Sequence, residues 1–134
     1  MLTIQEISSQ LPKVYEVISN ERVIALCRLR GLNDLAEKII HDPPLQPFKS
    51  DGCSCWFQEW NKVEMFPACF FHDIKYWCGY PGENVARLIA DAELMIDIAT
   101  LTNSTEMAET MFHGVRIGGG SIFKQSFSWG FGRM

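Results

Sequence analysis

The amino-acid sequence predicts a small all-α domain, and three observations lead to this prediction. Several stretches repeat apolar residues at helical spacing, few runs alternate as a half-buried strand would, and the composition is typical of a globular chain. The chain has 134 residues, of which 47% are hydrophobic and 21% are charged. This length and composition suit one domain over residues 1–134 with a core of its own.

Residues 1–40 are expected to form two N-terminal helices. Apolar side chains at helical spacing predict the first over residues 3–19, where Pro12 predicts a kink or a break. The same spacing predicts the second over residues 21–40, with Gly31 as its weak point. A pair of prolines ends this helix, because proline disfavours helical geometry in the residue before it.

A long connection over residues 43–66 separates these helices from the rest of the chain. It contains three prolines and one glycine, and so long a connection in a small domain is often functional. Pro67 suits the first turn of the helix that follows, which we expect to end near Gly79. A longer helix is predicted over residues 83–101, and two helices joined by so short a turn lie antiparallel.

The C-terminal part of the chain begins with a capping signal. Asn103 and Glu106 have the spacing of a capping box, which predicts a last short helix to about His113. The remaining tail, residues 114–134, is rich in glycine and aromatic residues and has no acidic residue. We expect this tail to be a strap packed on the helices.

Charge and hydropathy exclude several classes of protein. Sixteen acidic and twelve basic residues give a net charge of −4, which does not favour nucleic-acid binding. The longest apolar run, Met65 to Phe71, has seven residues and is far too short to cross a membrane. The N-terminus has neither the basic nor the apolar region of a secretory signal, so we expect none in this chain.

An acidic residue interrupts the apolar face of the helix predicted over residues 83–101. On a helical wheel Asp91 falls between Met95 and Ile98, whereas Glu93 and Asp97 are expected to face solvent. A buried carboxylate is costly unless it is paired. The ordinary explanation is that Asp91 bonds an arginine or a backbone amide.

A histidine in the preceding helix offers Asp91 a different partner. His72 and Tyr76 are four residues apart and therefore share a face of their helix. If the two helices are antiparallel, Asp91 reaches one ring nitrogen of His72 and leaves the other free to take a proton. This is the usual arrangement of a general base, and Tyr76 is placed to donate to the same carboxylate. A buried histidine of the core is the alternative.

Two further carboxylates predict a cation site beside this histidine. Asp73 is turned by about 100° from His72, toward the loop that contains Asp51 and Gly52. Two carboxylates with backbone carbonyls form the oxygen site that Ca²⁺ prefers. Taken alone, Asp51 would be interpreted as a solvated turn residue.

A structural zinc module is a competing interpretation of the same segment. Its four ligands would be Cys53, Cys55, Cys69 and His72. The Cys-x-Cys spacing is less usual than Cys-x-x-Cys, and a zinc module would leave Asp73 and Asp91 unexplained.

The segment over residues 48–100 resembles the bacterial and fungal secreted phospholipase A2 enzymes. The resemblance rests on three runs and one tyrosine: Asp51-Gly52-Cys53-Ser54, Pro67-Ala68-Cys69, His72-Asp73 and Tyr76. It implies that this segment is a catalytic core with two antiparallel helices and a preceding calcium-binding loop. The implied reaction is Ca²⁺-dependent hydrolysis of the sn-2 ester of a glycerophospholipid, which releases a fatty acid and a lysophospholipid.

The resemblance also assigns roles to individual residues. His72 would be the general base, Asp91 would orient it, and Tyr76 would support this pair. Ca²⁺ would be held by the side chain of Asp51, the carbonyl of Gly52 and the side chain of Asp73. An inactive relative that binds lipid or protein is a further alternative.

The resemblance implies one disulfide bridge, between Cys53 and Cys69. Cys55 and Cys78 are candidates for a second bridge, and Cys27 is expected to be a buried small hydrophobic residue. The family is secreted, whereas this chain shows no signal peptide, so we assign no compartment. These features are compatible with a monomer.

A phospholipid membrane or micelle surface is the partner that the resemblance implies. About half of the aromatic and large apolar residues around the site are expected in the core, and the others would meet lipid. These residues are Trp56, Phe57, Trp60, Met65, Phe66, Phe70, Phe71 and Trp77. The tail offers an alternative lipid contact through Arg116, Lys124 and Arg133 beside Phe123, Phe127, Trp129 and Phe131.

Overall fold

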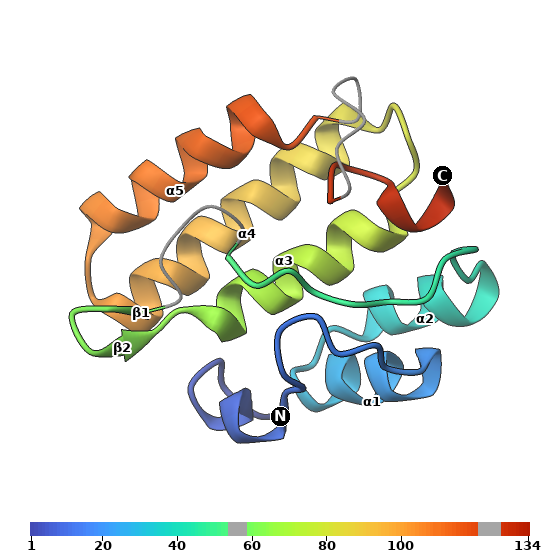
Figure 1. Ribbon diagram of the computed structural model, residues 1–134, viewed down its shortest axis with the longest axis horizontal. Helices are drawn as coiled ribbons and strands as arrows, with labels where there is room; N and C mark the ends of the chain where they lie inside the picture. The colour runs from blue at the N-terminus through green and yellow to red at the C-terminus, as the bar shows by residue number, and fades with distance from the viewer. Residues whose placement is uncertain (54–58, 121–126) are drawn as a thin grey trace.

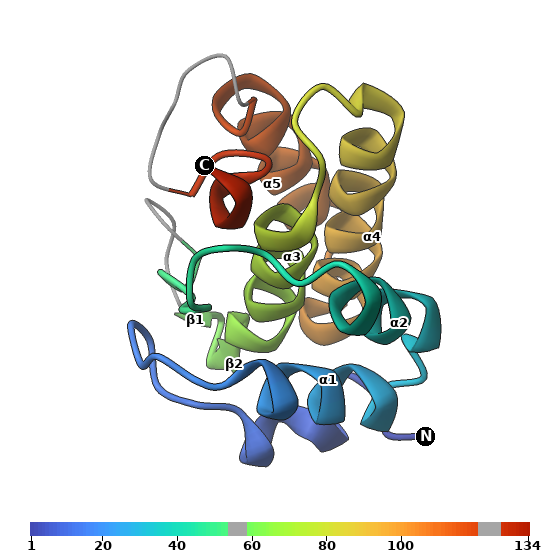
Figure 2. The ribbon, with the colours of Figure 1, turned by 90° about the vertical axis from the view of Figure 1, so that its right-hand side faces the viewer.

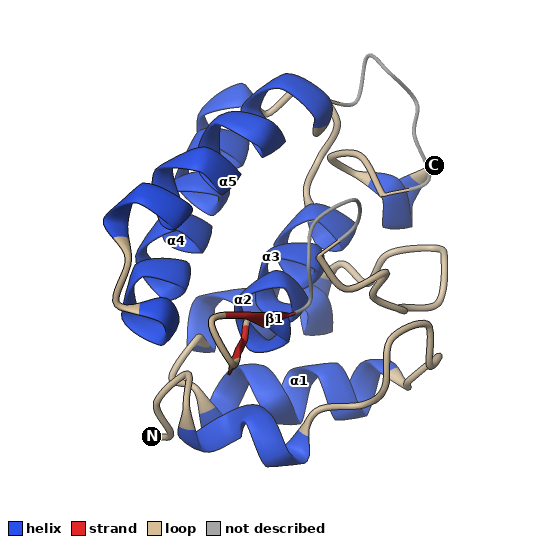
Figure 3. Ribbon diagram, turned by 60° about the vertical axis from the view of Figure 1, so that its left-hand side comes forward, coloured by secondary structure: helices blue, strands red, loops and turns tan. Residues whose placement is uncertain are grey.

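A computed structural model describes residues 1–53, 59–120 and 127–134, and the chain is mostly helical, as predicted. Figures 1 and 3 show that helices make up most of the chain and that the only sheet among these residues is a small hairpin. No helix of the described residues is long and apolar enough to cross a membrane. In chain order the elements are η1 (Glu6–Gln10), α1 (Asn20–Leu29), α2 (Asn33–His41), β1 (Glu59–Trp60), β2 (Val63–Glu64), α3 (Phe66–Cys78), α4 (Asn84–Thr102), α5 (Thr105–Gly118) and η3 (Phe131–Arg133).

Helix α3 lies at the centre of the molecule. Figures 1 and 2 show α4 beside it, running in the opposite direction, with α5 against α4 and with α1 and α2 near the other side of α3. Twelve of the thirteen α3 residues are buried, and Lys75 is the exception. One face of α3 packs Phe70, Phe71 and Trp77 against the N-terminal third of the chain. Because α3 is covered on both sides, its buried polar residues His72, Asp73 and Tyr76 form hydrogen bonds with other parts of the chain.

The prediction of one helix over residues 3–19 is wrong. The structure has only the short 3-10 helix η1, after which Leu11 is extended, with φ −80° and ψ 151°. Pro12 explains the break, since proline lacks the backbone donor and its ring clashes with the preceding turn of a helix. The irregular chain continues to Ser19, whose side chain accepts a hydrogen bond from the backbone of Arg22 and caps α1.

The helix predicted over residues 21–40 is present as two helices. Gly31, the predicted weak point, has φ +79°, a left-handed conformation that separates α1 from α2. A Cβ there would lie 2.1 Å from the Sδ of Met1, but this side chain is exposed and can move aside, so the backbone conformation is what favours glycine. The chain therefore turns at Gly31, and α2 lies against α1 rather than extending it.

The two longer helices agree with their predicted ranges, and the last helix differs in its cap and length. Helix α4 ends where Asn103 adopts a left-handed conformation, with φ 56°. Ser104, not Asn103, caps α5 by accepting a hydrogen bond from the backbone of Met107. Helix α5 continues to Gly118, beyond the end predicted near His113.

The prediction that Asp97 faces solvent is wrong. Asp97 is 7% exposed and accepts two hydrogen bonds of 3.0 Å from the guanidinium of Arg30. This pair joins α4 to the residue that follows α1. The two residues are 67 positions apart, so the helical pattern around Asp97 could not predict the contact.

The last eight residues form a strap that packs on α3. Trp129 is 3% exposed, and its indole nitrogen donates to the carbonyl of Tyr80. Arg133 donates to the carbonyl of Cys78 at the end of α3, and its guanidinium lies over the ring of Tyr80. Residues 127–134 therefore pack on the helices, but residues 114–118 of the predicted tail, which include Arg116, belong to α5. Phe123 and Lys124 lie outside the described residues.

Candidate functional site

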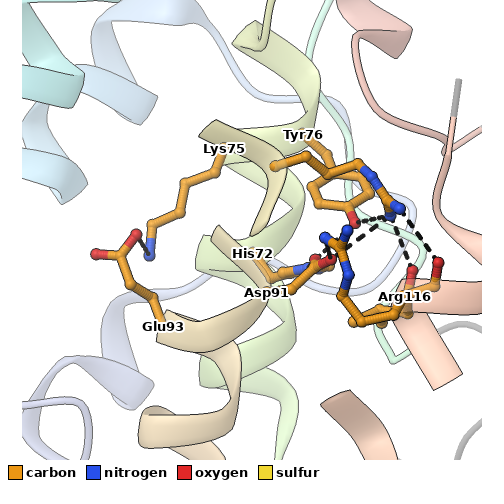
Figure 4. Close-up of polar contacts among 8 residues, drawn as sticks. His72, Lys75, Tyr76, Asp91, Glu93 and Arg116 are labelled. Atoms are coloured by element: carbon orange, nitrogen blue, oxygen red, sulfur yellow. Dashed lines mark hydrogen bonds and ion pairs between the residues drawn. The ribbon is translucent and has the colours of Figure 1, made fainter. Parts of the chain in front are cut away.

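The structure brings His72 of α3 and Asp91 of α4 into direct contact. The Nε2 atom of His72 lies 2.7 Å from Oδ1 of Asp91, and the hydroxyl of Tyr76 donates to the same oxygen at 2.6 Å (Figure 4). His72 is 7% exposed and Asp91 is fully buried. The contact follows from the antiparallel helices, which place the shared face of His72 and Tyr76 opposite the apolar face that Asp91 interrupts.

Burial and hydrogen bonding set the protonation states of this trio. Burial lowers the pKa of His72 below its usual value, although Asp91 acts in the opposite direction. Burial alone would raise the pKa of Asp91, but hydrogen bonds from His72, Tyr76 and Arg116 bring it below the usual value. Burial and the nearby Asp91 raise the pKa of Tyr76, so its hydroxyl stays a donor. A neutral His72 that donates from Nε2 keeps Nδ1 as an acceptor.

Two arginines complete the surroundings of Asp91. Nη1 of Arg116 lies 2.8 Å from Oδ2 of Asp91, and Nη1 of Arg87 lies 3.5 Å from the same oxygen. The expectation that an arginine pairs with Asp91 is therefore met together with the histidine contact. Neither arginine was predicted to pair with Asp91. Arg87 precedes Asp91 by four residues on the same helix, so their spacing could have predicted this pair. Arg116 lies on another helix, and no spacing in the sequence indicates its contact with Asp91.

Asp73 points to the loop before the hairpin, as predicted. Its Oδ2 accepts a hydrogen bond of 2.6 Å from the hydroxyl of Ser50, and that hydroxyl accepts one of 3.0 Å from the backbone of Gly52. Asp73 also lies beside Asp51, whose backbone N–H donates to it and whose side chain is near its carboxylate. The structure thus brings Asp51, Gly52 and Asp73 together, and it adds Ser50, which the sequence analysis did not single out.

The electrostatics of this carboxylate pair fit a cation. Burial, followed by the charge of Asp51, raises the pKa of Asp73 well above its usual value. Two carboxylates so placed repel each other, and a bound divalent cation removes both the repulsion and the cost of burial. The donor atoms of these two side chains are oxygens, the ligand type that Ca²⁺ prefers.

A disulfide joins the loop to α3. Cys53 and Cys69 are bridged, with Cα atoms 5.1 Å apart, as the resemblance implied. Cys69 lies one helical turn before Asp73, so the bridge fixes the loop next to this carboxylate. The bridge argues against the zinc module, because two of its four ligands are not thiolates. Within the described ranges no cluster of three or more His, Cys, Asp and Glu side chains is arranged to hold a metal ion.

Cys78, a candidate for a second bridge, is not bridged to another described cysteine. Cys78 is a buried free thiol, and Cys55 lies outside the described residues. Cys27 is fully buried, as predicted. Burial raises the pKa of Cys27 to about 12 and that of Cys78 to about 11, so both remain neutral thiols.

Most of the aromatic residues near the site belong to the core. Five of the eight are buried: Met65, Phe66, Phe70, Phe71 and Trp77. Trp60, in β1, is partly buried, and Trp56 and Phe57 lie outside the described residues. The fraction of these eight residues that lies in the core is therefore larger than the half that was expected.

Comparisons with known proteins give no relative from which a function could be transferred. No family model matches the chain, and neither a curated protein nor a solved structure matches it. A function can therefore be argued only from the site itself. In this site the buried His72 is held by the carboxylate of Asp91, and two further acidic residues, Asp51 and Asp73, lie nearby.

Proposed function

We propose that the protein is a Ca²⁺-dependent phospholipase A2, which hydrolyses the sn-2 ester of a glycerophospholipid. The observation that carries the proposal is the hydrogen bond between His72 and Asp91 across antiparallel helices, with Asp73 directed to the loop of Asp51. A histidine of the core with only a structural role would need neither a buried carboxylate on one nitrogen nor a second acidic pair beside it.

His72 is the general base of the proposed reaction. Its Nε2 is engaged by Asp91, so Nδ1 is the nitrogen that accepts a proton from water. The hydroxide that forms attacks the ester carbonyl, and His72 later returns the proton to the leaving alcohol. Asp91 keeps the imidazole in this tautomer and stabilises the imidazolium. Tyr76 holds the same carboxylate oxygen in place.

The acidic pair is the proposed cation site. Asp51, Asp73 and the carbonyl of Gly52 would hold Ca²⁺, and Ser50 orients Asp73 through its hydroxyl. When bound, the ion supplies positive charge for a phosphate oxygen and for the oxyanion of the tetrahedral intermediate. The disulfide keeps the loop and α3 at a fixed separation, which a preformed site requires.

Fatty-acid release from phosphatidylcholine vesicles tests this proposal. We expect release that requires Ca²⁺, stops with excess chelator and is lost in His72→Asn. The exposed His113→Asn is the matched control and should keep full activity. Release that persists in His72→Asn, or no release by the wild-type protein in any condition, would contradict the proposal. Vesicle binding without release would instead favour a lipid-binding relative.

A second pair of variants separates catalysis from stability. Asp91→Asn and Asp97→Asn each remove a buried carboxylate of α4 that is paired with arginine. Both should lower the free energy of unfolding, because each leaves a partly buried guanidinium without its carboxylate partner. Only Asp91→Asn should abolish release.

A further inference from the structure

Asp91 is held at both of its oxygens, and the two oxygens have different partners. Oδ1 accepts from His72 and Tyr76, and Oδ2 accepts from Arg116 at 2.8 Å. Contacts on one oxygen alone would leave the carboxylate free to rotate about its bond to Cβ. With Arg116 on Oδ2, that rotation is blocked, and Oδ1 remains directed at the histidine.

Arg116 reaches Asp91 from a third helix, and a second arginine holds that helix in place. Nη1 of Arg87 donates to the carbonyl of Val115 at 3.0 Å, and Nη2 donates to the carbonyl of Arg116 at 3.1 Å. Both carbonyls belong to the last turn of α5, and that of Val115 also accepts a hydrogen bond of 2.9 Å from the backbone of Gly119. Nη1 of Arg87 also donates to the hydroxyl of Tyr76 at 3.1 Å. Helix α4 therefore fixes the end of α5 at the point where Arg116 extends to Asp91.

We infer that Arg116 is a positioning residue of the proposed active site. Its guanidinium fixes the carboxylate of Asp91, which in turn fixes the ring of His72 in the tautomer with the proton on Nε2. Arg116 lies outside the segment that resembles the phospholipase A2 enzymes, so the resemblance does not assign it this role. The catalytic part of the inference rests on the proposed function, whereas the effect on the histidine tautomer does not.

The tautomer of His72 can be measured without turnover. With ¹⁵N-labelled histidine, at about pH 8 where exposed imidazoles are neutral, the ring nitrogens of the wild-type protein should report a single Nε2-protonated form for His72. His113 is exposed and serves as the internal reference for averaged tautomers, whereas Nε2 of His41 lies 3.1 Å from Oε2 of Glu37 and is therefore not used. Arg116→Ala should shift the ring signals of His72 toward those of His113.

The matched control is Arg30→Ala, which removes the arginine that pairs with Asp97, a different aspartate of α4. Its partner Asp97 does not touch the histidine, so the signals of His72 should not change even though the fold loses stability. Arg116→Lys keeps the positive charge and should retain most of the wild-type tautomer, and it also covers the case in which Arg116→Ala does not fold. Wild-type ring signals in a folded Arg116→Ala protein would overturn the inference.

Turnover provides a second and separate readout. Arg116→Ala should lower kcat on the order of 10- to 100-fold, as is usual when a group that orients a catalytic ligand is removed, with little change in KM. Guanidinium at about 10 mM, far below denaturing concentrations, should restore part of the kcat of Arg116→Ala but not of His72→Asn. Arg30→Ala should keep the wild-type kcat.

The two readouts keep the inference distinct from the proposed function. A wild-type protein without phospholipase activity would contradict the proposed function, and the ring signals of His72 would still decide whether Arg116 positions Asp91. An active wild-type protein whose kcat is unaffected by Arg116→Ala would contradict the catalytic part of the inference alone.

Discussion

Cys53 is covalently joined to Cys69, so the loop that carries Asp51 cannot move away from the helix that carries Asp73. The bridge closes a loop of 16 residues and lies one helical turn from the acidic pair. It therefore acts on two properties at once, the stability of the fold and the geometry of the proposed calcium site.

The first prediction concerns this bridge. The double variant Cys53→Ser/Cys69→Ser should lose about 3 kcal/mol of unfolding free energy, the usual value for a closed loop of this length. It should also require more Ca²⁺ for half-maximal activity, because Asp51 is no longer held at a fixed distance from Asp73. Urea unfolding and a calcium titration measure the two effects. A variant with unchanged calcium dependence would show that the loop is positioned by its other contacts.

The second prediction concerns pH. His72 acts as a base only when it is neutral, and burial lowers its pKa below the usual value of about 6.5. Activity should therefore be full at pH 7 and should fall as the pH drops through the lowered pKa. The profile of kcat/KM is to be measured at saturating Ca²⁺, since protonation of Asp73 also weakens the calcium site. An acidic limb centred above pH 7 would contradict the assignment of His72 as the base.

The third prediction concerns Asp73 in the absence of calcium. Its pKa is raised in the folded state, so its ionisation at neutral pH opposes folding, and its contribution to stability is lost as the pH rises from the unfolded value. Without Ca²⁺, Asp73→Asn should raise the Tm at pH 7, and it should remove the increase in Tm that Ca²⁺ gives the wild-type protein.

The exposed Asp34→Asn is the control for this comparison and should leave both Tm values unchanged. If Ca²⁺ stabilises Asp73→Asn as much as the wild-type protein, Asp73 is not a ligand and the calcium site lies elsewhere.

The central part of the site could be predicted from local sequence because its residues interrupt regular patterns. His72 and Tyr76 share a face by their spacing, and Asp91 is conspicuous as a carboxylate on an apolar stripe. Pro67 and the Gly79 turn mark the ends of α3, so the antiparallel arrangement of α3 and α4 follows from a short connection.

The parts that could not be predicted depend on contacts between distant residues. Arg116 meets Asp91 over 25 positions, and Ser50 meets Asp73 over 23, with no local pattern that marks either residue. The prediction of a helix over residues 3–19 was wrong for a related reason. Ile4, Ile7 and Leu11 have helical spacing, but they are brought to the core by an irregular chain rather than by one helix.

The last prediction uses two neighbouring glycines at the end of α5. A Cβ on Gly119 would lie 2.6 Å from the hydroxyl oxygen of Tyr76 and 2.7 Å from the carbonyl of Val115, whereas a Cβ on Gly118 would meet nothing within 4 Å. Tyr76 is 2% exposed and donates to Asp91, so its hydroxyl cannot move aside without leaving that carboxylate. Gly119→Ala should therefore lower both kcat and the free energy of unfolding.

Gly118→Ala should leave kcat unchanged and increase stability by up to about 1 kcal/mol, the usual gain of alanine over glycine in a helix. The two substitutions add the same methyl group at adjacent positions, and only the methyl group on Gly119 meets Tyr76 and the carbonyl of Val115. Equal activity of the two variants would show that the hydroxyl of Tyr76 is not needed to hold Asp91. A loss of activity confined to Gly119→Ala would show that the end of α5 sets the geometry of the histidine–aspartate pair.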